Sequence, residues 1–152
     1  MEIVIALGIL AIAGMLTYSS WGKYKARSCG RYAAMQFVQD LRFAREQALV
    51  RSTNVYVKFG RHPGYTIYAG PTIDPVTHRV DPDHKGTVIK TGELYEKYGP
   101  PLTMTPEEGE ILFTHLGTLN SDATTVTRVT FGTVPGIVKS ITVLPTGFSR
   151  LE

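Results

Sequence analysis

The chain has 152 residues, of which 43% are hydrophobic and 19% are charged, so it is long enough to bury a core and is not a disordered protein. Its net charge of +3 comes from the N-terminal third, because residues 53–152 carry nine basic against ten acidic side chains. The single cysteine, Cys29, excludes an intrachain disulfide and a cysteine-based metal site.

An uninterrupted apolar run opens the chain. No side chain from Ile3 to Leu16 is polar, and a boundary rich in Tyr, Trp, Lys and Arg follows at residues 18–27. The run is slightly shorter than the about 20 residues that span a bilayer as a helix, and its boundary has the composition of a membrane interface. Glu2 stands at the head of this run, where a carboxylate in an apolar environment needs a positively charged partner or a wet surface.

Helical periodicity continues beyond the apolar run. Apolar side chains recur at spacings of three and four, and Arg31, Gln36, Asp40, Arg42 and Glu46 occupy the opposite face. No proline precedes Pro63. The pattern therefore predicts one continuous helix from about residue 2 to about residue 52, whose second half packs on the rest of the protein through Ala33, Phe37, Leu41, Ala44 and Ala48.

After residue 52 the pattern changes to short β-branched or alternating runs separated by Gly and Pro. We expect loops at 70–86 and 98–109, and strands at 55–59, 65–69, 87–90, 110–114, 124–131 and 138–144. The sequence predicts an α+β fold in which a long N-terminal helix packs on a small antiparallel sheet domain. It divides into a hydrophobic assembly or membrane helix (1–25), the amphipathic second half of that helix (26–52) and a β-rich head (53–152).

Three other interpretations of the opening run remain open. A secretory signal peptide would need a basic segment before the apolar run, and the only early charge here is acidic. A plain membrane anchor explains the run, but Lys23, Lys25 and Arg27 directly after it would keep the head in the cytoplasm. A helix buried in the core explains neither the length nor the aromatic and basic boundary.

The segment MEIVIALGILAIAG resembles the N-terminal signature of type IV pilins and type II secretion pseudopilins, in which a processed, methylated N-terminus leads into a glutamate and an apolar helix. The resemblance implies that Glu2 sets the register of neighbouring subunits. Gly8 and Gly14 are either close-packing positions between helices or points where the helix loosens. The apolar residues that would form the filament core are Ile3, Val4, Ile5, Leu7, Ile9, Leu10, Ile12, Met15 and Leu16.

Two further segments are similar to the GspH/FimT-like group of pseudopilins. One is LRFAREQA at 41–48, followed by Arg51 and the strand that begins at Val55; the other is TGFSR at 146–150. The resemblance implies an exported subunit whose leader is removed by a prepilin peptidase and whose helix is held in the inner membrane before assembly. An assembly machinery would then place it, with further copies or with other pilins, in a cell-surface filament or a periplasmic pseudopilus.

No pattern of residues in the sequence indicates an enzyme, a cofactor or a metal. The four histidines lie in separate contexts without ligand spacing, and Asp74, Asp81 and Asp83 do not fit a calcium loop. We interpret Cys29 as a small core residue; the alternatives are an intermolecular disulfide and a lipidation site. We therefore expect neither catalytic residues nor metal ligands.

The alternative function is that of a DNA-binding minor pilin in a DNA-uptake system, because some FimT-like proteins are implicated in that process. The candidate DNA contacts on the head are Arg128, Lys139 and Arg150. Phosphate binding needs a local cluster of basic groups. The sequence places such a cluster only at Lys23 to Arg31, where a lipid headgroup or helix-flanking role accounts for it.

Overall fold

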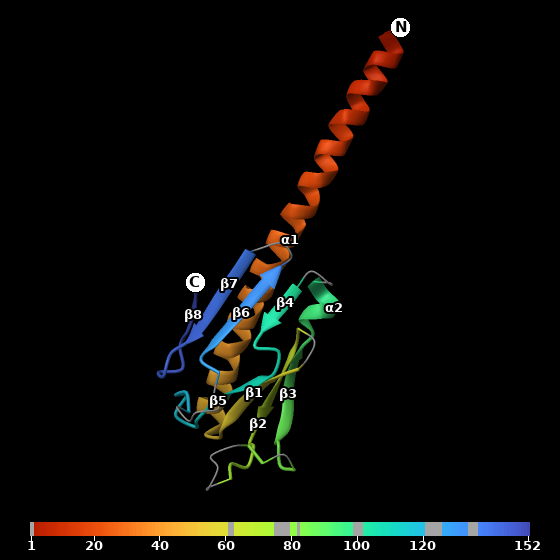
Figure 1. Ribbon diagram of the computed structural model, residues 1–152. Helices are drawn as coiled ribbons and strands as arrows, with labels where there is room; N and C mark the ends of the chain where they lie inside the picture. Colours follow the sequence, from red (N-terminus) through yellow and green to blue (C-terminus); the bar gives the residue numbers. More distant parts are fainter. Residues whose placement is uncertain are drawn as a thin grey trace.

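The computed structural model describes residues 2–60, 63–74, 80–81, 83–98, 102–120, 126–133 and 137–152; within these, the side chains of 2–23, 25–27, 137 and 138 are outside the description. A single helix, α1 (Glu2–Arg51), opens the chain. Its first half extends away from the head and its second half lies against the head (Figure 1). The helix ends where Ser52 takes a φ of 52° and the N–H of Thr53 bonds to the carbonyl of Ala48.

The head contains two four-stranded sheets, in which every described strand pair is antiparallel. The first sheet has the order β3-β2-β1-β5 and consists of β1 (Val55–Phe59), β2 (Tyr65–Ala69), β3 (Thr87–Gly92) and β5 (Gly109–Phe113). The second has the order β4-β6-β7-β8 and consists of β4 (Leu102–Thr105), β6 (Arg128–Thr133), β7 (Ile137–Val143) and β8 (Ser149–Leu151). The short helix α2 (Leu94–Tyr98) connects β3 to β4. This architecture confirms the predicted α+β fold, with two sheets in place of one.

The prediction of a loop at 98–109 was wrong, since this segment contains β4. Leu102 and Met104 alternate with exposed threonines and are buried when β4 pairs with β6. The sequence also did not predict α2 or β8. β4 and β8 have only four and three residues and α2 is little more than one helical turn, so local periodicity does not distinguish them from loops, and contacts with distant parts of the chain decide whether they form.

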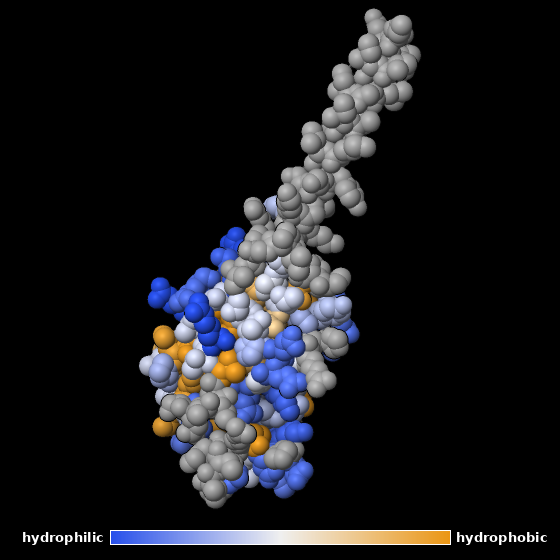
Figure 2. Space-filling view, viewed as in Figure 1, coloured by the Kyte–Doolittle hydropathy of each residue, from blue (hydrophilic) through white to orange (hydrophobic). Residues whose placement is uncertain are grey.

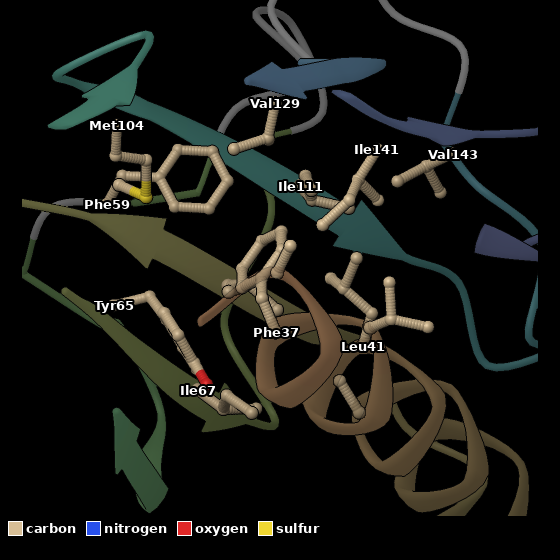
Figure 3. Packing of buried hydrophobic residues seen from close by; sticks show 14 of the residues in the cluster. Phe37, Leu41, Phe59, Tyr65, Ile67, Met104, Ile111, Val129, Ile141 and Val143 are labelled. Carbon is tan, nitrogen blue, oxygen red and sulfur yellow. The ribbon is translucent and has the colours of Figure 1, made fainter. Parts of the chain in front are cut away.

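The core lies where the second half of α1 crosses both sheets. Phe37 is fully buried, and its ring lies 5.7 Å from that of Phe59, 4.9 Å from that of Tyr65 and 5.5 Å from that of Phe131, measured between centroids. Figure 3 shows Phe37 and Leu41 pointing from the helix towards residues of both sheets, among them Ile67 and Ile141. One apolar core therefore fixes the helix to the two sheets at once.

Candidate functional site

An apolar seam runs along the face of α1 that contacts the head. The five residues predicted for this contact are at most 1% exposed and belong to the core: Ala33, Phe37, Leu41, Ala44 and Ala48. Three of the five are alanines, whose small side chains let the helix backbone come close to the strands. The predicted assembly residues from Glu2 to Leu16, including Gly8 and Gly14, lie in the first half of α1, and their side chains are outside the described part of the chain.

A buried carboxylate connects α1 to the first sheet. Asp40 is only 4% exposed, and its carboxylate accepts hydrogen bonds from the Tyr65 hydroxyl at 2.5 Å and from the Lys90 ammonium at 2.7 Å. Burial, followed by the hydrogen bond to Asp40, raises the pKa of Tyr65 above its ordinary value, so this hydroxyl remains a neutral donor. Asp40, Tyr65 and Lys90 form what we call the Asp40 clamp, which ties the helix to β2 and β3.

The sequence pattern placed Asp40 and Gln36 on the solvent-facing side of the helix, and for Asp40 this was wrong. Because α1 packs against two sheets and α2, its buried arc is wider than its apolar stripe. A carboxylate is tolerated in this arc when charged and neutral donors satisfy it. Gln36 is half-buried, and its side-chain carbonyl accepts hydrogen bonds from the Lys97 ammonium at 2.8 Å and the Tyr98 hydroxyl at 3.0 Å.

Cys29 extends the contact between α1 and the end of α2. Its side chain is 8% exposed, and its thiol donates a hydrogen bond to the carbonyl oxygen of Tyr98 at 2.8 Å. This placement agrees with the interpretation of Cys29 as a small core residue. A thiol in such a position is poorly placed for an intermolecular disulfide or a lipid, both of which need access from solvent.

Arg45 connects α1 to two turns that are far apart in the sequence. Its Nε donates to the carbonyl of Gly117 at 2.9 Å, and its guanidinium lies 4.1 Å from the centroid of the Phe148 ring. Because Arg45 lies in the LRFAREQA segment and Phe148 in TGFSR, the two segments that carried the resemblance meet in space. Both segments were recognised in the sequence, but their contact was not predicted, because nothing in their local pattern relates them.

The second of these turns, at 144–147, requires glycine at its last position. Gly147 has a φ of 79°, and a Cβ at this position would lie 2.1 Å from the Gly117 carbonyl oxygen and 3.0 Å from the Arg45 Nε. We expect Gly147→Ala to destabilise the head by about 2–3 kcal/mol, because it combines left-handed backbone strain with a collision against backbone. Urea unfolding of the full chain, followed by near-ultraviolet circular dichroism, measures this loss.

Gly60→Ala is the matched control for this substitution. A Cβ at Gly60 would meet no atom of the described residues within 4 Å, and the residue is exposed. We expect a change of less than about 0.5 kcal/mol for this variant. Equal losses for the two variants would contradict the role assigned to Gly147.

The candidate DNA contacts do not gather in one place. Arg128 and Arg150 both pair with Thr142 across β6, β7 and β8, so they lie on the same face of the second sheet. Lys139 pairs with the buried Phe131 and therefore lies on the opposite face. The guanidinium of Arg128 also lies 3.4 Å from the carboxylate of Glu152, which offsets one of the two charges on the shared face.

The described residues contain no group of three or more His, Cys, Asp or Glu side chains that could hold a metal ion. The imidazole of His84 bonds to the carboxylate of Asp81 at 2.9 Å, and the backbone N–H of Asp83, followed by His84, lowers the pKa of Asp81. His62 and His78 lie outside the described residues.

Within the part of the chain that is described, no helix is both long and apolar enough to cross a membrane.

On the face of the head seen in Figure 2, the described residues form a mixed surface of hydrophilic and scattered apolar areas. Two of the head's most exposed large apolar side chains are Leu116, 65% exposed, and Phe148, 58% exposed. They belong to the two turns that meet at Arg45. The ring of Phe148 is covered on one side by the Arg45 guanidinium, which leaves its other side to solvent.

Two solved structures resemble the chain, and both are crystal structures of the type IV minor pilin FimU of Pseudomonas aeruginosa strain PAO1. The first has a TM-score of 0.52 at 17% identity, and the match covers 80% of this chain and 91% of the chain in that crystal structure. The second, from another crystal form, has a TM-score of 0.55 at 18% identity and covers 85% and 92%. At these identities the likeness establishes the fold. No curated protein shows significant sequence similarity to the chain.

The long helix laid across antiparallel sheets, together with this likeness, shows that the chain has a pilin-like α+β fold. The family follows from the sequence. Residues 33–147 match the family described as type II transport protein GspH, and the chain belongs to that family. The predicted membership of the GspH/FimT-like pilins and pseudopilins is thereby confirmed.

Proposed function

We propose that this protein is a structural subunit of a type IV pilus-like or pseudopilus filament and that it polymerises through residues 1–25. The observation that supports this proposal is that the two halves of α1 differ: the second half packs on the head and the first half does not lie against it (Figure 1). Among the side chains of α1 that the structure describes, the buried ones lie between Cys29 and Ala48, and the first half of the helix extends beyond the head (Figure 1). That first half contains the apolar sequence from Ile3 to Leu16.

An apolar helix of this kind needs a cover outside its own chain. Burying one Leu or Ile side chain contributes about 1.5–3 kcal/mol, so neighbouring helices or lipid would stabilise this segment strongly. In the proposed cycle the inner membrane supplies the cover first, and other copies or other pilins supply it after the assembly machinery has built the filament. The prepilin peptidase would act before that step. The role is structural, without catalysis.

Glu2 is the residue through which we propose that neighbouring helices find their register. We expect Glu2→Ala to lower the filament yield about tenfold, which corresponds to a loss of about 1.4 kcal/mol per subunit contact. The head should remain folded. Electron microscopy and sedimentation of the full-length protein measure the yield, and near-ultraviolet circular dichroism measures the fold of the head.

Glu46→Ala is the control, because it removes an exposed carboxylate from the half of the same helix that packs on the head. Its filament yield should equal that of the natural sequence. Normal yield from Glu2→Ala would contradict the register role. If the natural sequence itself formed no filaments, alone or with other pilins, the structural proposal would fail.

The DNA-binding minor pilin is the second candidate, and one observation favours it: Arg128 and Arg150 share an open sheet face. Against it, Glu152 lies beside Arg128 and Lys139 lies on the other face. Salt-sensitive retention of DNA by the full-length protein, lost in Arg150→Ala, would support this candidate. We favour the filament subunit, because this function explains the long first half of α1 that extends beyond the head, whereas DNA binding would involve only a few side chains of the second sheet.

A further inference from the structure

The last strand of the second sheet has an open edge. β8 pairs with β7 on one side, and it stands at the end of its sheet (Figure 1). Ser140 and Glu152 exchange both of their backbone hydrogen bonds, and the alternation of an antiparallel ladder makes Thr142 and Arg150 the next bonded pair. The backbone N–H and C=O groups of Ser149 and Leu151 therefore point away from β7, and no described residue pairs with them.

Two of the other sheet edges are protected. At the edge of β5, the N–H groups of Asn120 and Val126 bond to the carbonyls of Leu112 and Glu110. The pairing of β3 with β2 is interrupted by a β-bulge between Ile67 and Tyr68, and bulges disfavour the addition of another strand. β8 has a regular register with β7 and no proline, and its one charged side chain, Arg150, lies on the face away from the helix.

A groove of about 220 Å³ lies between this edge and α1. The side chains of Ser149 and Leu151 share the core-facing side of the sheet with Val143 and Ile141, with which they pair. One part of the groove is apolar, because the hydrophobic side chains of Met35 and Leu151 line it; they are 41% and 39% exposed. The residues that line the groove are Met35, Val38, Gln39, Arg42, Ser149 and Leu151.

Among the polar side chains that line the groove, those of Arg42 and Ser149 have no partner among the described residues. Arg42 is exposed, and the structure gives it no hydrogen bond and no ion pair. The Ser149 hydroxyl is buried and makes no hydrogen bond. β8 runs antiparallel to α1 (Figure 1), so from Phe148, whose ring lies against Arg45, the strand continues past Ser149 and Leu151 towards earlier residues of the helix. Arg42 and Met35 on that part of α1 also line the groove. The groove thus offers a cation at one end and an apolar surface at the other.

We propose that the edge of β8 binds an extended segment of a partner protein, which adds to the second sheet as a fifth strand. The open backbone groups of Ser149 and Leu151 require an extended backbone, because only a strand presents donors and acceptors at their spacing. Alternate side chains of that strand would face α1. The segment would therefore carry an apolar side chain against Met35 and Leu151 and, two residues away, an acidic side chain at Arg42. This site does not depend on the filament function.

Backbone hydrogen exchange in the full-length protein tests the site directly. The probe is the capped peptide TTVTETT, which presents valine and glutamate two residues apart on one face. We expect the peptide to slow exchange of the Ser149 and Leu151 amides, measured by nuclear magnetic resonance, and to leave the Arg150 amide unchanged because it already bonds to β7. Absence of this pattern at the highest soluble peptide concentration would overturn the proposal.

Two variants separate strand addition from unspecific association. Leu151→Pro removes a donor that points away from β7, so the head should stay folded while peptide binding is lost. Arg42→Glu should bind TTVTETT about threefold more weakly and should prefer the peptide TTVTKTT, because the substitution replaces an exposed ion pair by a repulsion between like charges, which solvent largely screens. Lys85→Glu, an exposed charge change elsewhere, is the control. Unchanged binding by Leu151→Pro, or an unchanged charge preference in Arg42→Glu, would overturn the proposal.

Discussion

Phe37→Ala is expected to lower the free energy of unfolding of the head by about 3–5 kcal/mol. The side chain is fully buried, and its ring contacts Phe59 and Tyr65 of the first sheet and Phe131 of the second. Its removal leaves a cavity where the helix meets both sheets, and rigid strands on two sides cannot close it. Urea unfolding of the full chain, followed by near-ultraviolet circular dichroism, measures the loss.

Val50→Ala is the control for this prediction. Val50 lies near the end of the same helix and is 79% exposed, so its truncation removes no core contact. Alanine has the higher helix propensity, and we expect a change of less than about 0.5 kcal/mol. A loss below about 1 kcal/mol for Phe37→Ala would mean that α1 is not held by the core described above.

Asp40→Ala is expected to lower the free energy of unfolding of the head by about 2–3 kcal/mol. The substitution leaves the buried Tyr65 hydroxyl without its acceptor, and a buried unsatisfied donor costs about 1–3 kcal/mol. Lys90 contributes less, because its side chain is 44% exposed and can turn to water. The same unfolding measurement, repeated with Glu46→Ala as an exposed acidic control, determines the difference.

A double-mutant cycle identifies the cause of this loss. Tyr65→Phe removes the donor, so the double variant Asp40→Ala with Tyr65→Phe should be more stable than the sum of the two single losses predicts. We expect a coupling free energy of about 1–2 kcal/mol. Strictly additive losses would show that Asp40 stabilises the head by a route other than the Tyr65 hydroxyl.

The Asp40 clamp and the contacts of Arg45 explain how a small head is held in a fixed orientation on a long helix. The apolar seam supplies most of the attraction between α1 and the head, but an apolar contact alone restricts rotation and sliding only weakly. The Asp40 clamp fixes the helix to β2 and β3, and Arg45 fixes its last turns to the chain near Gly117 and Phe148. In the filament that we propose, the orientation of each head would then follow from the position of its helix.

Short motifs in the sequence indicate the family of the protein, whereas the contacts in the structure show what the residues of these motifs do. The quoted segments pointed to the GspH/FimT-like group, and the sequence match over residues 33–147 shows the membership. The contact between Arg45 and Phe148 gives these segments a physical role, since they hold the end of the helix to the C-terminal turn. The open edge of β8 has no counterpart in any local motif.

The sequence by itself determined the helix from about residue 2 to 52, most of the longer strands, the apolar seam and the family, because each of these depends on local periodicity or on a short motif. Tertiary structure decided the division into two sheets, the existence of β4, α2 and β8, and the burial of Asp40. The physical reason is the distance along the chain: Tyr65 lies 25 residues from Asp40, and Gly117 lies 72 residues from Arg45. Local patterns show which residues favour a helix or a strand, whereas only the folded chain shows which of them meet.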